Sequence, residues 1–393
     1  MKVKLSVRLS VAIWGLAFSA QCVLGIQTFT DAKTPETRLS GVIAYSCLTG
    51  KEDSPYIPKV FDLYIERLPG HKPIQLTDAR QSKLLGHDIG DVSIDATGKY
   101  VAFTCHGSSS HQASVGLSLW IVNLPTRSLT LVTKDIASYE WSPRGSRLLT
   151  LSSSTLNNKY SIYDATVNTK RVLMSATDVA DLHWINNGRS VIYGIANKLV
   201  KEMELKSGKV MTRWKSPDDQ GFEIYASPVN QSAIIYTGTK CYSLVSSRSG
   251  VSGRSGRLNS SFDVGNFDPP GLIWSSDGRH FAIHDYTHYP PREPGTDTLP
   301  TCTDQFIDIC DSRNVKAGRT ALSWTDSVTG PYRYRLVKWV NRRGSLLIFD
   351  RGANEGGSSN QGQLICYNPV TRSRDSLIQF GLMISSIDWH EGP

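Results

Sequence analysis

The fold is indicated by one stretch of sequence, Trp141-Ser-Pro-Arg-Gly145 followed by Arg147-Leu-Leu-Thr-Leu151. It joins an aromatic residue, a tight polar turn that ends in glycine, and an apolar strand. The same phrase returns as Trp274-Ser-Ser-Asp-Gly278, followed by His280-Phe-Ala-Ile-His284. Recurrence of one strand–turn–strand unit is typical of a repeat protein whose units stack on one another.

Weaker copies keep the position of this phrase and change some of its residues. Its first residue, which we call the anchor, recurs about every 49 residues along the chain. One interval is longer than the rest and indicates an insertion. The anchors are Ile94, Trp141, Trp184, Ala226, Trp274, Trp339 and Trp389.

The remaining pattern consists of short alternating runs rich in Val, Ile, Tyr and Trp, broken by Gly, Pro, Asn, Asp or Ser, and no helical period persists. The chain is therefore predicted to be all-β. Each unit has room for four antiparallel strands, A to D, with the anchor at the end of strand A and the glycine turn leading into strand B. Such units pack face to face in a β-propeller, with the anchor tryptophans between blades.

The two ends of the repeat region complete each other. Ile387-Asp-Trp-His-Glu-Gly-Pro393 supplies a strand A with no strand after it, and Gly41-Val-Ile-Ala-Tyr45 is a strand B with no strand A before it. The sequence predicts that they share one blade, which closes a ring of seven blades and leaves no free sheet edge at the junction.

Residues 1–25 are interpreted as a signal peptide, and residues 26–393 as a single propeller domain. Lys2, Lys4 and Arg8 precede the apolar run Leu9–Gly25, which ends in small residues. Of the net charge of +8, about +5 then remains, which is not the balance of a nucleic-acid-binding protein. No later stretch has the roughly 20 apolar residues of a membrane helix. We expect an exported monomer, periplasmic or secreted.

The six cysteines after residue 25 suit an oxidising compartment, where disulfides are permitted. Cys302 and Cys310 are the nearest pair, and the seven residues between them are expected to form a loop, so a local disulfide is predicted there. The other four lie inside strand-like runs and are interpreted as small buried apolar residues. They are Cys47, Cys105, Cys241 and Cys366.

These phrases resemble the TolB-type propeller repeats, relatives of WD-repeat blades in secreted and periplasmic proteins. Units of that family carry Trp-Ser-Pro-Asp-Gly followed by an Ile-Ala-Tyr-like strand, and Trp141–Gly145 and Trp274–Gly278 are the best matches here. The resemblance covers nearly all of residues 26–393. It implies an extracytoplasmic scaffold that binds proteins or glycans. TolB itself has six blades and an additional α/β domain, and neither feature is expected in this chain.

Long connections between strands B and C gather on four consecutive predicted blades and on one face. They are expected at residues 46–60, 105–116, 285–304 and 351–361. Loops longer than about 12 residues are uncommon unless they bind or cover something, so we call these four connections the lip and take them as the candidate binding site. Neutral insertions on a rigid scaffold are the alternative. Aromatic rings and guanidinium groups in the lip suit a protein or sugar surface. The candidate residues are Tyr56, His106, His284, Tyr286, His288, Tyr289, Arg292 and Arg351.

Two patterns bear on metal binding. His284 and His288 are four residues apart, which makes a ligand pair on a helix, but Pro290 and Pro291 argue against a helix and favour a structural role. In four units an aspartate precedes the anchor by six residues, in the expected D-to-A connection. These carboxylates would converge on Ca²⁺, or would serve as ordinary turn residues, which is the favoured interpretation. They are Asp88, Asp135, Asp178 and Asp268.

The sequence favours binding over catalysis. The chain contains no Gly-x-Ser-x-Gly motif, which excludes a fused serine peptidase, and no linear motif groups a nucleophile with a base. No catalytic residue and, apart from the Ca²⁺ alternative, no cofactor is predicted. The alternative function is a carbohydrate-active enzyme of the propeller lyase type, whose site would assemble at the channel mouth from several blades.

Overall fold

The anchors lie at or within two residues of the end of a strand, and a tight turn follows most of them. β8 (Ile136–Trp141) ends at its anchor and pairs with β9 (Arg147–Ser153). The turn is closed by the N–H of Ser142, which donates to the carbonyl of Arg147 at 2.7 Å. Gly145 has a φ of +72°, a left-handed conformation that glycine adopts without steric cost. The recurring phrase is therefore the A-to-B hairpin, as predicted.

The structure is a computed structural model, and the chain divides into Met1–Leu39 and Ser40–Pro393. The predicted signal peptide, residues 1–25, lies outside the described part of the chain. The structure describes residues 39–48, 61–70, 72–77, 88–106, 117–153, 158–196, 198–216, 221–237, 241–245, 252–256, 272–287, 304–312, 314–325, 334–340, 344–350, 362–380 and 384–392.

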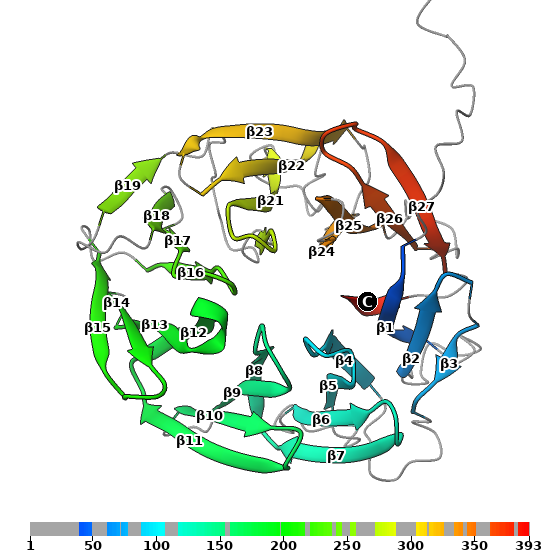
Figure 1. Cartoon of the computed structure of the whole chain (residues 1–393), viewed down its shortest axis with the longest axis horizontal. Helices are drawn as coiled ribbons and strands as arrows, with labels where there is room; N and C mark the ends of the chain where they lie inside the picture. Colours follow the sequence, from blue (N-terminus) through cyan, green and yellow to red (C-terminus); the bar gives the residue numbers. More distant parts are fainter. Residues whose placement is uncertain are drawn as a thin grey trace, which may run out of the picture. The chain divides into compact units, whose positions relative to one another are not determined.

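Within these residues the strands pair into seven four-stranded antiparallel sheets arranged around a centre (Figure 1). Four of them, in pairing order, are formed by β28 (Ile384–Glu391), β1 (Gly41–Leu48), β2 (Phe61–Leu68) and β3 (Ile74–Gln75); by β4 (Asp88–Ile94), β5 (Tyr100–His106), β6 (Ser118–Asn123) and β7 (Ser128–Thr133); by β8, β9, β10 (Asn158–Asp164) and β11 (Thr169–Ala176); and by β12 (Val179–Ile185), β13 (Ser190–Ile195), β14 (Leu199–Glu204) and β15 (Val210–Lys215).

The other sheets follow the same order, so the all-β propeller of four-stranded antiparallel sheets expected from the sequence is confirmed. A short 3₁₀ segment, Asn186–Gly188, forms the turn after the anchor Trp184. These sheets are formed by β16 (Glu223–Ala226), β17 (Ala233–Tyr236), β18 (Cys241–Val245) and β19 (Ser252–Gly256); by β20 (Leu272–Trp274), β21 (His280–Thr287), β22 (Asp304–Asp311) and β23 (Asn314–Thr325); and by β24 (Tyr334–Val340), β25 (Ser345–Asp350), β26 (Gln363–Tyr367) and β27 (Arg374–Gln379).

The anchor tryptophans join neighbouring sheets by one repeated hydrogen bond. The indole N–H of Trp184 donates to the carbonyl of Glu140, one residue before the preceding anchor, at 3.0 Å. Trp141 bonds Ser93 in the same way at 3.2 Å. The equivalent bonds of Trp274 to Tyr225 and of Trp339 to Ile273 measure 3.2 and 3.1 Å. The predicted packing of these four tryptophans between blades is therefore confirmed, with a directional bond at each junction.

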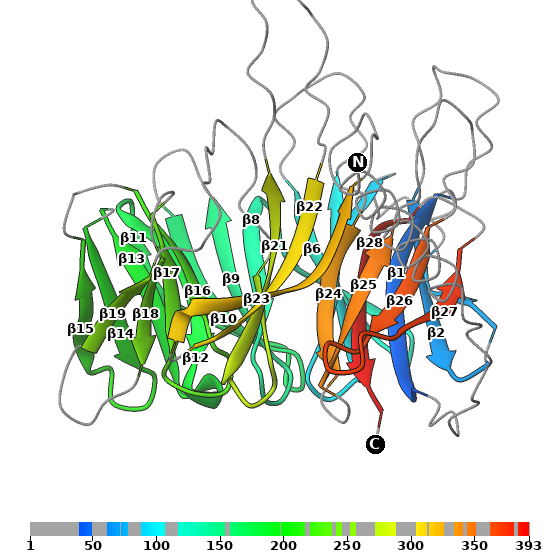
Figure 2. The same ribbon diagram turned by 90° about the horizontal axis from the view of Figure 1, so that it is seen from above.

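Trp389 departs from this rule. Its side chain is 1% exposed, and its indole N–H has no hydrogen-bond partner in the structure. The strand that carries it, β28, pairs with β1 from Gly41 opposite Glu391 to Cys47 opposite Ile384. One sheet thus contains the first and the last strand of the described chain. β28 is the red strand at the C-terminus beside β1 in Figure 1, and Figure 2 shows the same two strands side by side.

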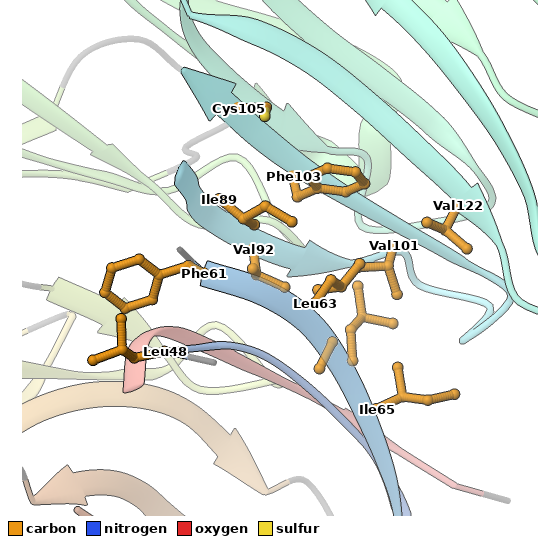
Figure 3. Packing of buried hydrophobic residues seen from close by; sticks show 12 residues of the cluster. Leu48, Phe61, Leu63, Ile65, Ile89, Val92, Val101, Phe103, Cys105 and Val122 are labelled. Atoms are coloured by element: carbon orange, nitrogen blue, oxygen red, sulfur yellow. The ribbon is translucent and has the colours of Figure 1, made fainter. Parts of the chain in front are cut away.

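The apolar core lies between the sheets. Figure 3 shows one of its clusters, in which Leu63 of β2 faces Val92 and Phe103 of the adjacent sheet. Cys105 belongs to the same cluster and is fully buried, while Cys47 and Cys366 are 4% and 3% exposed. The expectation that these three cysteines fill apolar positions in strands is confirmed. None of the described segments forms a helix with the length and apolarity needed to cross a bilayer.

The difference between Trp184 and Trp389 gives a test of the junction bond. Trp184→Phe should leave the Glu140 carbonyl without its donor, whereas Trp389→Phe removes a buried N–H that has no acceptor. Both tryptophans are at most 1% exposed, so the loss of ring volume is similar. We expect Trp184→Phe to lower the free energy of unfolding by about 1–3 kcal/mol more than Trp389→Phe does. Chemical denaturation measures this difference, and equal losses would contradict it.

Candidate functional site

The residue directly before each anchor occupies an equivalent place on the inner strand of its sheet. The inner strands β4, β8, β12, β16, β24 and β28 lie nearest the centre in Figure 1. An inner strand is a sheet edge, so half of its backbone N–H and C=O groups need partners from outside the sheet. The residues at this position, which we call the inner ring, are Ser93, Glu140, His183, Tyr225, Ile273, Lys338 and Asp388.

Two ion pairs connect inner-ring residues of neighbouring sheets. His183 Nδ1 lies 2.9 Å from Glu140 Oε2, and both side chains are about one-third exposed. Lys338 Nζ lies 3.3 Å from Asp388 Oδ1. Each pair therefore joins equivalent positions of consecutive repeats.

Polar side chains of one sheet also bind the free backbone N–H groups of the next inner strand. Asp388 Oδ2 accepts the N–H of Ile94 at 2.7 Å, and Ser386 Oγ accepts the N–H of Val92 at 3.0 Å. The carboxylate of Asp181 accepts the N–H of Ile224 in the same manner. These bonds provide acceptors for backbone N–H groups of the inner strands that would otherwise lack a partner.

The charges of β8, β12 and β16 shift one another's protonation. Burial would lower the pKa of His183, but the hydrogen bond to Glu140 and the charges of Glu140 and Asp181 outweigh it, so the pKa is raised. Burial raises the pKa of Asp181, against the charge of His183 and the Ile224 N–H. Burial also raises the pKa of Glu223, with the nearby Asp181 charge adding to it and the Tyr225 hydroxyl opposing it.

Two cavities meet at Ser138–Glu140 on β8. The larger, of about 460 Å³, is bounded by residues of β4, β8, β24 and β28. The smaller, of about 280 Å³, runs along β9 and β10 and reaches His183. Three carboxylates and one ammonium group line the larger cavity. It therefore favours a ligand that offers positive charge or hydrogen-bond donors. These charged residues are Asp91, Glu140, Asp388 and Lys338.

The larger cavity extends along the inner strands from Ile94 and Trp141, the last residues of β4 and β8, toward the opposite face. Thr104, Leu117 and Ala137, which line it, come from the end of β5, the approach to β6 and the beginning of β8. In an antiparallel meander these are the strand ends where B-to-C and D-to-A connections begin. The cavity thus extends to the face on which the lip was predicted.

The lip residues themselves are mostly beyond the described structure. Tyr56, His288, Tyr289, Arg292 and Arg351 lie outside the described residues. The lip therefore stays a prediction.

Three other lip residues fall on strand ends rather than in loops. The backbone of His106 ends β5, and His284 and Tyr286 belong to β21. β21 continues to Thr287, which pairs with Asp304, so the expectation of a loop from residue 285 is wrong. The extension is set by pairing with β22, which the sequence of β21 alone does not reveal.

The predicted aspartate positions do not form one equivalent set. Asp135 and Asp178 lie in turns before β8 and β12, as expected, with Asp135 at a φ of +57°. Asp88 is instead the first residue of β4, and Asp268 lies outside the described residues. Among the described residues no group of three or more His, Cys, Asp or Glu side chains is placed to hold a metal ion. Ca²⁺ binding stays a prediction, and the turn interpretation fits Asp135 and Asp178.

The loop expected between Cys302 and Cys310 is wrong, because Asp304–Asp311 form β22. Cys310 is fully buried beside Trp274 and Phe281, six residues after Asp304. That separation is about 20 Å along an extended strand, whereas bridged cysteines have Cα atoms within about 7 Å. Cys302 lies outside the described residues, so the disulfide itself stays a prediction.

Sequence reasoning missed the inner ring, although a signal for it existed. The position one residue before the anchor holds Glu140 and His183 in consecutive repeats, and Lys338 and Asp388 in another two. Opposite charges at the same place in adjacent repeats indicate contact across a blade junction.

The comparisons show the fold alone. No protein-family description and no curated protein sequence matches this chain. The structure is similar to that of a putative 6-phosphogluconolactonase from Bacteroides uniformis, with a TM-score of 0.54 and 12% identity over 89% of this chain and 99% of that one. A putative 6-phosphogluconolactonase from Bacteroides fragilis gives 0.52 and 10% over 92% and 100%.

TolB from Acinetobacter baumannii is also similar, with a TM-score of 0.47 and 15% identity over 89% of this chain. The match spans 66% of the TolB chain, just under two thirds of its length. At these identities none of the likenesses transfers an activity.

The Glu140–His183 pair predicts a titration. The pKa of His183 should lie above about 6.5, and Glu140→Gln should lower it. Because the folded value is raised, the stabilising effect is full below about pH 6.5 and is lost as the pH rises through the folded value. His390, whose pKa is lowered by burial and by the Lys338 charge, is an internal control of opposite sign. Histidine NMR titration measures both, and a His183 pKa unaffected by Glu140→Gln would contradict the assignment.

Proposed function

We propose that this protein is an exported, TolB-like propeller scaffold that binds a protein or glycan partner on the face of the B-to-C connections. The observation that carries the proposal is the cavity of about 460 Å³ that extends to that face. Concave sites with a few converging polar groups are the usual places for ligands. The lip would add contact area around the cavity.

The positions of the flanking strands support this placement. The long connections of the lip leave from β1, β5, β21 and β25, which belong to four sheets that follow one another. Hydrogen bonds join these sheets in sequence through Trp339, Lys338 and Ile94. The larger cavity is bounded by β24, β28 and β4, the inner strands of three of them, and by β8 of the next sheet.

The charged side chains of the inner strands are already held by hydrogen bonds, which supports binding rather than turnover. Asp388 bonds Lys338 and the Ile94 N–H, and Glu140 bonds His183. Glu223 Oε2 accepts the Tyr225 hydroxyl at 2.7 Å. Side chains held in this way fix neighbouring sheets and present a rigid surface.

Export and assembly are part of the same proposal. Residues 1–25 have the character of a signal peptide, and the mild positive charge of the rest argues against a nucleic-acid partner. We infer that the scaffold acts as a monomer in the periplasm or outside the cell.

Ser138 offers a way to block the cavity without breaking a junction bond. Ser138 is exposed and lines both cavities, so Ser138→Trp should fill them. We expect at least a tenfold loss of partner capture from envelope extract or from a glycan array, about 1.4 kcal/mol. Ser175→Trp, at an exposed position on β11, is the matched control and should bind normally. Unchanged capture by Ser138→Trp would refute the site, and release of unsaturated sugars from acidic polysaccharides would support the lyase alternative.

We also infer that the seven sheets form one ring that depends on the pairing of β28 with β1. A Cβ atom on Gly41 would overlap the His390 carbonyl oxygen and the Trp389 ring, so the two strands need glycine there. Gly41→Ala should therefore destabilise the protein by about 1–3 kcal/mol. At Gly221 an added Cβ meets nothing within 4 Å, so Gly221→Ala should be neutral. Thermal or chemical denaturation compares the two, and equal stability would argue against closure through this pair of strands.

A further inference from the structure

A separate cavity of about 420 Å³ lies at the outer rim between the first two sheets. Its floor is aliphatic, formed by Ile65, Ile74, Leu76 and Leu124, and its charged lining residues are Arg67, Lys72 and Arg127. We call it the rim groove. Arg67 is the last residue but one of β2, Lys72 precedes β3, and Arg127 lies in the turn from β6 to β7. In a meander these C-to-D turns are on the face opposite the B-to-C connections, so the rim groove is distinct from the site proposed above.

The floor of the rim groove is the partly exposed end of an apolar core cluster. Ile65 belongs to the buried cluster of Figure 3, and Leu76 and Leu124 pack against that cluster while keeping part of their surface accessible. Ile74 is 38% exposed. The apolar contact between the two sheets therefore continues outward into a surface that a partner would cover.

The charge of the rim groove is of one sign. The described lining residues include three cations and no carboxylate, and none of the ion pairs between described residues involves them. Glu66, the nearest acid along β2, alternates with Ile65 and Arg67 and so points to the other face of the sheet. The groove is complementary to an anion that also has apolar parts.

The backbone of Arg127 has a left-handed conformation that is unfavourable for a residue with a Cβ atom. Its φ is +57°, and its N–H donates to the carbonyl of Asn123 at 2.7 Å to close the C-to-D turn. The equivalent position in the turn from β14 to β15 is Gly208, with a φ of +71°. A left-handed residue with a Cβ costs conformational energy that glycine avoids, and such outliers gather at functional sites. Arg372 occupies the equivalent position in the turn from β26 to β27, is not among the residues that line the groove, and provides a matched control.

The outer edge of β3 offers backbone N–H and C=O groups to a partner in the rim groove. Leu76 donates to the Leu63 carbonyl at 2.8 Å, and Gln75 lies opposite Tyr64. Because hydrogen-bonded and non-hydrogen-bonded pairs alternate in an antiparallel ladder, the N–H and C=O of Gln75 point away from β2. An extended chain placed there would gain backbone hydrogen bonds.

We propose that the rim groove binds an extended peptide segment of a partner protein that alternates acidic and aliphatic side chains and aligns along β3. The carboxylates meet Arg67, Lys72 and Arg127, and the aliphatic side chains cover the floor. None of the described residues that line the groove is aromatic, which favours aliphatic groups over sugar rings, since rings are commonly held by stacking on aromatic faces.

The test uses a labelled eight-residue peptide of alternating glutamate and valine and the intact protein, with fluorescence anisotropy as the readout. The peptide should bind, and a lysine–valine peptide should not. Arg127→Gly should weaken binding at least fivefold while the melting temperature stays equal or rises. Arg372→Gly, the same change in the equivalent turn, should bind within twofold of the unchanged protein.

A second pair of variants tests the strand edge. Gln75→Pro removes the outward N–H without using a ladder bond and should weaken binding several-fold, whereas Gln75→Ala should not. The proposal is overturned if Arg127→Gly or Gln75→Pro binds the peptide as well as its control does. It is also overturned if the glutamate–valine peptide does not bind, or if polygalacturonate displaces it as effectively as unlabelled peptide, which would assign the groove to a glycan.

Discussion

The hydrogen bond from an anchor indole to the carbonyl one residue before the preceding anchor is the interaction on which the other features depend. It fixes the height and the angle at which one sheet meets the next, because an indole N–H has a single donor direction. Four junctions use it, at Trp141, Trp184, Trp274 and Trp339. Where the anchor is Ile94, Asp388 and Ser386 take over by binding backbone N–H groups directly. The frame therefore keeps one spacing even where its tryptophan is missing.

The need to join neighbouring sheets by hydrogen bonds also explains which side chains the inner strands carry. Inner strands are edges, and edge groups that lack partners are costly. Carboxylates and hydroxyls placed one and three residues before an anchor satisfy the next strand and at the same time put charge at the centre. The raised pKa of His183 and that of Asp181 are consequences of this crowding. Rigidity and electrostatic character thus come from the same side chains.

The antiparallel meander separates two kinds of surface. Connections from B to C leave from one face, to which the larger cavity with its excess of carboxylates extends. Turns from C to D lie on the other face and reach the outer rim, where Arg67, Lys72 and Arg127 surround aliphatic residues. Charges of opposite sign on separate surfaces suit two partners of different chemistry, which one rigid frame would hold at a fixed distance.

The repeat unit, its strands and its turns could be predicted from the residues alone, since the spacing of anchors and the need for positive φ at Gly145 and Gly278 are local properties. The strands at Gly41–Tyr45 and Ile387–Trp389 could be predicted in the same way. The contacts across junctions, such as that of Glu140 with His183, could not, because they depend on the stagger between sheets. Pairing likewise extended β21 to Thr287 and made Ser252–Gly256, a run of glycine and serine around one arginine, into the strand β19. Ladder hydrogen bonds from a neighbour outweigh weak local propensity, and no single strand encodes its neighbour.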